Sequence, residues 1–457
     1  MKIVFYSTST NNFDSQAVEI TNIPDNNSFF SDFKALYPKD SFYVVTQKPA
    51  LFMPERDVIL ASLQATPQEV AELIAEQKPD LVIAMTFWVA PFDWLNISDA
   101  LVAEKLKEKG IKTICNPLET GLICFDKNRS REFFEAKGFS CPKTLFVDHD
   151  MFFCAGSHKD VLRNAYKESV FIQLKELQLP LVIKDTVGLS SYSLAVVNTY
   201  GEACAYLNSK KNNSNRIIQE FAEGLQVGVE IYGKPGNYTV LPPFIFSVNK
   251  YGITSPKQSV KYSQGTEWTQ TKEFLDLQKE MLRLAELLKI QGAAQVDLVL
   301  KQGKWQIIEI NPRLSGMTLA YCSALESNVF DLMYRGITGR LSEKTASPTL
   351  SIKLPPQDKK LLKEINQLNQ ELTEAKIVHI SQIYDSSAKQ EREKGWCEVI
   401  ITGKERNKLQ TALQKLEKLF EASKQDILET QFPDKAIFEQ SELMLKCPPF
   451  PESHSQA

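Results

Sequence analysis

A short segment near residue 300 gathers side chains that are suited to binding a metal ion. Asp297 lies on one predicted strand, and Glu309 and Asn311 lie on the next strand, after a turn at Gln302-Gly303. Paired strands hold two carboxylates side by side, and residues two apart on a strand project from one face. Carboxylate and amide oxygens are hard ligands suited to Mg²⁺, so we predict that Asp297, Glu309 and Asn311 are metal ligands.

Arg313 extends this set by two further positions. Its planar guanidinium fork suits a carboxylate or a phosphate group. Each residue alone is a weak indication, because an exposed glutamate on a hairpin usually has no role. The set is more informative, since Glu309, Asn311 and Arg313 end the otherwise apolar run 305–308, and partly buried polar groups need partners.

A lysine and a glycine/serine loop upstream are candidates for binding phosphate. Lys184 ends an apolar predicted strand, which is an unusual place for a solvated lysine. Gly188, Ser190 and Ser191 follow it and offer N–H groups and hydroxyls to phosphate oxygens. Without Lys184 beside it, an ordinary surface loop would be the better interpretation. The sequence has no G-x-x-x-x-G-K-[S/T] loop, which disfavours a Walker-type ATPase.

The first 125 residues predict a lobe of alternating strands and helices. Residues 2–6 and 80–85 are short apolar strands, and a helix between them begins with the capping box Thr66-Pro67-Gln68-Glu69. A second helix over residues 99–109 and a strand over 111–115 follow. This order predicts a parallel, doubly wound, Rossmann-like lobe. No G-x-G-x-x-G follows the first strand, so a dinucleotide-binding oxidoreductase is disfavoured.

The middle of the chain is richer in strands. We predict strands over residues 180–184, 194–197, 216–221, 227–232, 238–246, 294–300 and 305–310. A helix with one apolar stripe runs from Thr271 to Ile290, before Gly292. The order indicates an α+β arrangement rather than a continued Rossmann repeat.

After Gly339 the composition shifts towards a third lobe. Residues 342–348 have linker character, and a charged helix (357–376), a strand (396–402) and a helix (407–420) follow. The predicted division is therefore an N-terminal α/β domain over 1–125, a central domain over 126–340 and a small C-terminal α/β domain over 341–457. These sizes are typical of domains.

Composition limits the class of protein without indicating a function. The 457 residues carry 53 basic and 56 acidic side chains, a net charge of −3, which argues against a nucleic-acid or membrane-surface binder. Eight cysteines include no C-x-x-C pair, and the N-terminus lacks the apolar run of a signal peptide. We therefore expect a soluble cytoplasmic protein with reduced thiols.

Four of these segments, in order, resemble the ATP-grasp superfamily. Asp297 with Glu309-Ile-Asn311-Pro-Arg313 is similar to its metal-binding motif. Asp126-Lys127, which opens a helix that ends at Gly138, resembles its entry segment, and Pro180 to Ser191 resembles its second phosphate-binding lysine and flexible loop. Residues 218–224 resemble the hinge strand that holds adenine. The resemblance covers roughly residues 120–320, and the order of four individually weak motifs is specific.

The resemblance implies roles for further residues. Lys127 and Lys184 would contact ATP phosphates, and the main chain of Glu220, Phe221 and Ala222 would hold adenine. Many family members place a Glu two residues after the hinge glycine to bind the ribose, and here that position is Gln226, which can still hydrogen-bond hydroxyls.

Lys261 is a candidate for a third phosphate contact, and a lysine without a role is an equal alternative. It lies in the polar stretch 256–267, which contains few large apolar residues. Such a stretch would suit a lid that closes over substrates.

The resemblance also implies the reaction, an ADP-forming ligation that joins a carboxylate to an amine through an acyl-phosphate. ATP and Mg²⁺, or Mn²⁺ in its place, would be required. Arg313, with N–H groups at Ser315-Gly316-Met317, would stabilise the oxyanion. The sequence after Arg313 looks more like amino-acid and peptide ligases than biotin-dependent carboxylases, because the Glu-His pair usual in the carboxylases is absent.

Small-molecule carboxylates and amines are therefore the expected partners, with a homodimer left open. The alternatives are a non-catalytic ATP-binding regulator of the same fold and an ATP-grasp enzyme with another acceptor. All three predicted metal ligands are present, which favours an enzyme.

Overall fold

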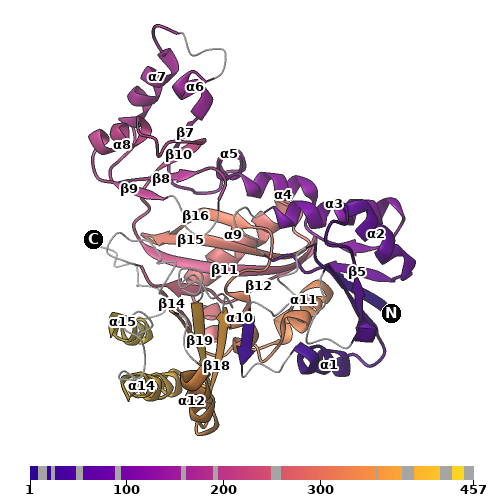
Figure 1. Cartoon of the computed structure of the whole chain (residues 1–457). Helices are drawn as coiled ribbons and strands as arrows, with labels where there is room; N and C mark the ends of the chain where they lie inside the picture. The colour runs from indigo at the N-terminus through magenta and orange to yellow at the C-terminus, as the bar shows by residue number, and fades with distance from the viewer. Residues whose placement is uncertain are drawn as a thin grey trace.

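The computed structural model describes residues 1–8, 18–21, 26–47, 55–87, 94–155, 161–188, 194–248, 259–355, 359–382, 396–422 and 435–446. Its strands form a five-stranded, a four-stranded and a ten-stranded sheet (Figure 1). This mixed α/β and α+β architecture confirms the predicted fold class. No helix in the described ranges is both long and apolar enough to cross a bilayer.

The N-terminal lobe is the predicted Rossmann-like unit. Its parallel sheet has the order β4 (Val58–Leu60), β3 (Ser41–Thr46), β1 (Lys2–Tyr6), β5 (Leu81–Ala84) and β6 (Thr113–Ile114). Helices α1 (Asn26–Leu36), α2 (Pro67–Glu76) and α3 (Leu95–Glu108) belong to it, with a 3₁₀ turn, η1 (Glu55–Asp57). The capping box is confirmed, since the Thr66 hydroxyl accepts from Glu69 N–H and the Glu69 carboxylate accepts from Thr66 N–H. Helix α3 begins four residues before the predicted start.

A small antiparallel sheet follows, reached through α4 (Leu118–Phe125) and α5 (Lys127–Ala136). It has the order β7 (Thr144–Val147), β10 (Arg216–Glu220), β8 (Leu181–Asp185) and β9 (Ala195–Val197). Helices α6 (His149–Phe153), α7 (Ala165–Leu174) and α8 (Tyr200–Leu207) accompany it. Figure 1 shows this unit projecting from one end of the molecule, with β8 and α5 lying towards β16. The predicted segments 180–184 and 216–221 are thus confirmed as strands.

The ten-stranded sheet forms the body of the molecule. Its order is β16 (Lys304–Asn311), β15 (Gly292–Lys301), β11 (Leu225–Lys234), β13 (Phe244–Phe246), β14 (Ser259–Ser263), β17 (Thr349–Leu354), β19 (Trp396–Gly403), β18 (Ala375–Gln382) and β2 (Val18–Thr21), with β12 (Asn237–Val240) also paired to β11. Its helices are α9 (Lys272–Leu287), α10 (Thr318–Ala324), α11 (Val329–Thr338), α12 (Lys359–Gln370), α14 (Arg406–Ala422) and α15 (Lys435–Lys446), with 3₁₀ turns η3 (Gly265–Gln270) and η4 (Leu341–Glu343).

Three predictions about this region are wrong. The single strand predicted over 238–246 is two strands, because Pro242 and Pro243 cannot donate ladder hydrogen bonds. The charged helix predicted to end at Lys376 ends at Gln370, and strand β18 begins at Ala375. The lid predicted over residues 256–267 is wrong from Ser259 onwards, because β14 is an interior strand between β13 and β17. Its residues Val260 and Tyr262 share one face and are buried.

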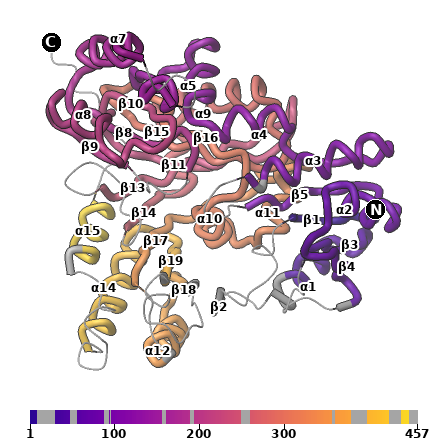
Figure 2. Tube along the Cα trace, turned by 45° about the horizontal axis from the view of Figure 1, so that its top comes forward, coloured from indigo at the N-terminus to yellow at the C-terminus, as the bar shows by residue number. Residues whose placement is uncertain are grey.

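The ten-stranded sheet crosses both predicted domain boundaries. Strand β14 pairs with β17, and β2 from the N-terminal segment pairs with β18 at the far edge. Figure 2 shows β17, β19 and β18 continuing from β14 beneath the body of the molecule. The domain boundaries at 125 and 340 therefore stay a prediction. In the structure, hydrogen bonds between strands join the three predicted regions.

Candidate functional site

The hairpin β15–β16 brings the predicted metal ligands together. Asp297 and Glu309 are opposite one another in the strand register, as are Gln295 and Asn311. The turn between the strands has positive φ at Gln302 (49°) and Gly303 (74°), the conformation of a tight hairpin. The sequence prediction of side-by-side carboxylates is thus confirmed as geometry.

The two carboxylates repel each other. Burial, and then the charge of Glu309, raise the pKa of Asp297 to about 7, although Gln295, Arg313 and Lys261 act in the opposite direction. A bound cation would remove this repulsion, because it favours the charged form of both groups. The donor set therefore fits a divalent metal ion.

Gln295 is a site residue that sequence reasoning missed. Its amide donates to Asp297 Oδ1 at 2.5 Å, and its carbonyl oxygen accepts from Asn311 Nδ2 at 2.9 Å. The bridge orients Asn311 so that its own oxygen is the remaining acceptor. The available signal was spacing, since Gln295 precedes Asp297 by two residues and so shares its face.

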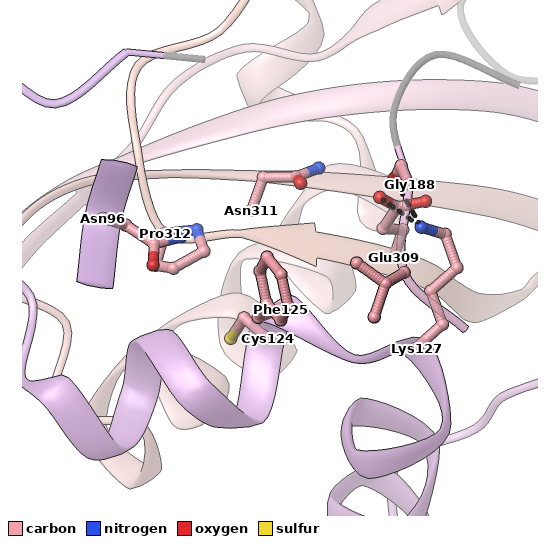
Figure 3. Close-up of a pocket in the computed structure, with 9 residues that line it drawn as sticks. Asn96, Cys124, Phe125, Lys127, Gly188, Glu309, Asn311 and Pro312 are labelled. Carbon is pink, nitrogen blue, oxygen red and sulfur yellow. Dashed lines mark hydrogen bonds and ion pairs between the residues drawn. The ribbon is translucent and has the colours of Figure 1, made fainter. Parts of the chain in front are cut away.

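Lys127 reaches the same place from the start of α5. Asp126 caps this helix by accepting from the N–H groups of Asn128 and Arg129. The Lys127 ammonium donates to the Gly188 carbonyl at 2.8 Å and lies 3.6 Å from Glu309 Oε1. Figure 3 shows Lys127 and Glu309 beside Gly188, brought together by α5, β16 and the segment after β8.

A pocket joins four of the predicted site residues. Its described lining residues are Asn96, Cys124, Phe125, Lys127, Val187, Gly188, Glu309, Asn311 and Pro312. Predicted phosphate and metal contacts therefore border one space (Figure 3). Ser190 and Ser191, which we also predicted to contact phosphate, lie outside the described residues.

Lys184 faces the carboxylates from the four-stranded sheet. Only 9% of it is exposed, and burial lowers its pKa to about 8, with Glu309 and Asp297 opposing this and Lys127 reinforcing it. Lys127 and Lys184 thus face the carboxylates of Asp297 and Glu309 on the β15–β16 hairpin. This arrangement is electrostatically suited to bridging by phosphate and metal.

Two of the three N–H groups predicted to face an oxyanion, those of Ser315 and Met317, are occupied within the loop after Arg313. Ser315 N–H donates to the Thr318 hydroxyl, and Met317 N–H donates to the Ser315 hydroxyl, both at 2.9 Å. These groups are used within the loop, so Ser315 and Met317 do not offer main-chain donors to an oxyanion in this structure. Gly316 is exposed, and Arg313 is buried with Nη1 donating to the Leu314 carbonyl.

Glu230 anchors this loop and was missed as a structural residue. Its side chain is fully buried and accepts from the hydroxyls of Ser315, Thr318 and Tyr232 at 2.6–2.7 Å. Burial raises the pKa of Glu230, while these three hydrogen bonds and Arg313 lower it. Since a buried carboxylate needs such partners, Glu230 holds the loop.

The predicted hinge residues lie where β10 passes into β11. Glu220 N–H donates to the Lys143 carbonyl, and Phe221 N–H donates to the Pro180 carbonyl. A main-chain contact of Glu220 with adenine must therefore use the Glu220 carbonyl. Ala222 lies beyond the end of β10. Gln226 lies on β11 opposite Val299, two residues from Gly228, which is opposite Asp297.

Lys261 lies at the site, although on a strand rather than on a lid. Its ammonium is 3.2 Å from the Gly316 carbonyl and 3.4 Å from Glu398 Oε1. It also lowers the pKa of Asp297. Among the described residues, no group of three or more His, Cys, Asp or Glu could hold a metal ion, so a metal here would depend on the Asp297–Glu309 pair, Asn311 and oxygens from a ligand.

The comparisons with known proteins agree with this geometry. Residues 124–317 match the family model described as "ATP-grasp domain". The chain is 22% identical over 280 residues to the carbamoyl phosphate synthase large chain of Methanoculleus marisnigri and 22% identical over 293 residues to that of Thermotoga neapolitana. These alignments cover 60% and 62% of this chain but 24% of each relative, so the chain spans about a quarter of the length of the curated relatives it matches.

Solved structures resemble almost the whole chain. N5-carboxyaminoimidazole ribonucleotide synthetase from Thermus thermophilus superposes with a TM-score of 0.59 at 16% identity, covering 91% of this chain and 98% of that one. L-amino acid ligase from Bacillus licheniformis gives a TM-score of 0.60 at 15% identity, covering 91% and 97%. Residues 124–317 therefore match the ATP-grasp domain family, and the chain as a whole shares the fold of these solved structures.

Proposed function

We propose that this protein is an ATP-dependent, ADP-forming ligase that joins a small carboxylate, such as an amino acid, to an amine. The observation that carries the proposal is the meeting of Lys127 and Lys184 with Asp297, Glu309 and Asn311. This is a set of cations for phosphate beside oxygen ligands for metal. The structural resemblance to an L-amino acid ligase supports it at the level of fold.

In the proposed reaction, a substrate carboxylate oxygen attacks the γ-phosphorus and the bond from phosphorus to the ADP oxygen breaks. The amine nitrogen then attacks the acyl carbon, the bond to phosphate breaks, and the amine releases a proton to water. The metal would stabilise charge on the phosphates.

The protein side chains have separate tasks in this scheme. Lys127 and Lys184 bind the negatively charged phosphate groups. Burial lowers the pKa of Lys184, so its positive charge is sensitive to pH. Asp297 and Glu309, with Asn311 oriented by Gln295, hold the metal. Arg313 is the proposed group for carboxylate or oxyanion, because it is a buried guanidinium at the end of the metal-binding strand.

The test measures ADP release from Mg²⁺-ATP with a panel of amino acids, using hydroxylamine to trap acyl-phosphate as a hydroxamate. We expect hydroxamate to form only when ATP, Mg²⁺ and a suitable carboxylate are all present. The Glu309→Gln variant should lose roughly 100-fold or more in rate, since it removes a metal ligand. The matched control Glu267→Gln, at an exposed position on η3, should match the unmodified chain.

The alternative is a non-catalytic ATP-binding protein of the same fold. Equal ATP turnover in the Glu309→Gln variant and the unmodified chain would favour that alternative. ATP turnover that no carboxylate changes would also contradict the ligase proposal.

A further inference from the structure

The N-terminal lobe contributes Asn96 to the pocket that Lys127 and Glu309 border. Asn96 lies in the first turn of α3, and only 3% of it is exposed. It shares the lining of the pocket with Pro312, which directly follows β16. Figure 3 shows Asn96 at the Pro312 end of this pocket, and Lys127 and Glu309 at the other end. The pocket therefore has a phosphate and metal end and an amide end.

The carboxamide oxygen of Asn96 is buried and has no hydrogen-bond partner among the described residues. It lies against α4, where a Cβ atom at Gly121 would be only 2.9 Å from it. The N–H of Gly121 cannot serve as its donor, because it already donates to the Pro117 carbonyl at 2.9 Å. Buried polar groups are nearly always hydrogen-bonded, so an exception in a pocket lining indicates a donor on a ligand.

The amide of Asn96 can turn its oxygen towards the pocket, because the last torsion of an asparagine side chain has a broad energy profile. Asn96 is the second residue of α3, so the start of this helix also borders the pocket. The helix begins at Trp94 without a side-chain cap and has no acidic residue in its first turn. Its partial positive charge therefore favours a carboxylate, while the amide oxygen favours a donor.

The position of Asn96 along the β15–β16 hairpin lies beyond the predicted metal site. Leu225, directly after the predicted hinge, is opposite Leu300 on β15. Asp297 lies three residues before Leu300 on β15, and β16 runs in the same direction to Pro312. An ATP molecule that extends from the hinge to the metal would point its γ-phosphate towards Asn96. The attacking oxygen must approach from that side, opposite to ADP.

Hydrogen bonds hold α3 against the end of β16. Asp99, in the next turn of α3, accepts from the Thr86 hydroxyl at 2.7 Å. The Thr86 carbonyl in turn accepts from Leu314 N–H at 3.0 Å. Asn116, which follows β6, donates to the Pro312 carbonyl at 2.7 Å. These contacts fix the start of α3 relative to the strand that carries the predicted metal ligands.

We propose that Asn96 recognises the amino group of the substrate whose carboxylate is phosphorylated, with its side-chain oxygen accepting a hydrogen bond from that group. The substrate is then a 2-amino carboxylate whose carboxylate lies between the start of α3 and the γ-phosphate. This inference rests on the ligase function proposed above and narrows its substrate class. It gives the N-terminal lobe a specificity-determining residue that lies outside the family match over 124–317.

The experiment uses the full chain with Mg²⁺-ATP and hydroxylamine, and it measures hydroxamate formed from matched carboxylates. Each 2-amino acid of a panel is compared with the acid that carries hydrogen in place of the amino group, such as alanine with propanoate and leucine with 4-methylpentanoate. Values of kcat and KM are determined for every acid. We expect kcat/KM to be roughly tenfold or more higher for the amino acid of at least one pair, since a hydrogen bond from a charged group is lost in its partner.

Variants assign this preference to Asn96. Asn96→Leu removes the acceptor and should raise KM for the amino acid roughly tenfold or more, while KM for the matched acid stays unchanged. Asn96→Asp keeps an acceptor and should retain the preference. Gly121→Ala should reproduce the loss, because the new methyl group displaces the amide oxygen. The control Asn407→Leu, at an exposed position on α14, should leave both KM values unchanged.

The outcomes separate the two proposals. Absence of hydroxamate with every acid contradicts the ligase function itself. Hydroxamate formed equally well from both members of every pair overturns the role of Asn96 and leaves the ligase function standing. A preference that survives in Asn96→Leu also overturns that role, as does an equal rise of both KM values, which a purely structural residue would give.

Discussion

At the residue scale, the site depends on charges that would be unfavourable without a ligand. Asp297 and Glu309 repel each other, and Lys184 is buried among groups that shift its pKa in opposite directions. Functional sites commonly keep such arrangements, because the bound ligand supplies the compensating charge. Phosphate and metal are the ligands that would compensate these particular residues.

The lowered pKa of Lys184 leads us to predict that ATP affinity depends on pH. Its pKa is about 8 in the free protein, so the ammonium loses its proton as pH rises through 8 and its attraction for phosphate falls. We expect the Kd for ATP to rise between pH 7.5 and 9.5, by at most about tenfold per pH unit. Calorimetry or fluorescence titration across this range provides the measurement.

The Lys184→Arg variant is the decisive comparison, because arginine stays charged throughout this range. Its ATP affinity should vary much less with pH than that of the unmodified chain. The exposed control Lys175→Arg should keep the full dependence. A pH dependence that survives in Lys184→Arg would assign it to another group.

At the scale of elements, the junction of β10 and β11 fixes the hinge. Gly224 has φ of +149°, and a Cβ atom there would lie 2.3 Å from the Leu300 carbonyl oxygen. Only glycine fits, so β11 can start directly beside β15. The close approach of the Gly224 backbone to the Leu300 carbonyl therefore positions the predicted hinge residues and Gln226.

Gly224→Ala tests this junction. We expect the free energy of unfolding to fall by more than the roughly 1–2 kcal/mol that left-handed backbone strain alone costs, with weaker ATP binding because the hinge must shift. The control Gly236→Ala has φ of +79° but nothing within 4 Å of its new Cβ, so it should show the strain alone. Urea unfolding and ATP titration of both variants provide the comparison, and equal losses would contradict a special role for Gly224.

At the scale of the whole molecule, an aromatic cluster attaches the N-terminal lobe to α11. The ring of Phe330 lies 5.1 Å from Phe5, 5.0 Å from Phe30 and 5.9 Å from Phe33, measured between centroids. Asp331 beside it accepts from the Tyr37 hydroxyl at 2.7 Å. These contacts join segments roughly 300 residues apart in sequence, and they hold the lobe against α11.

Phe330→Ala should cost about 3–5 kcal/mol of unfolding free energy, because it opens a cavity in this cluster. We also expect the N-terminal lobe to melt separately in calorimetry, because its attachment is weakened. Leu36→Ala on α1, whose side chain is 54% exposed, should leave the transition unchanged. A Phe330→Ala variant as stable as the unmodified chain would show that the lobe is held elsewhere.

Local sequence determined the elements and the hairpin that carries the predicted metal ligands. Alternation and turn chemistry placed β15 and β16, and a fixed period of two placed Asp297, Glu309 and Asn311 on one face. The capping box at Thr66 was equally local. Such features depend on neighbours within a few residues, so a sequence by itself specifies them.

Tertiary structure decided what those elements meet. Lys184 and Lys127 come to the carboxylates from another sheet, and Gln295 and Glu230 acquire their partners only when strands and loops pack. The contact between Lys261 and Glu398 needs three consecutive strands of the ten-stranded sheet, β14, β17 and β19, although the two residues lie 137 positions apart. Long-range pairing of this kind is set by burial of the opposite apolar face, which no local pattern encodes.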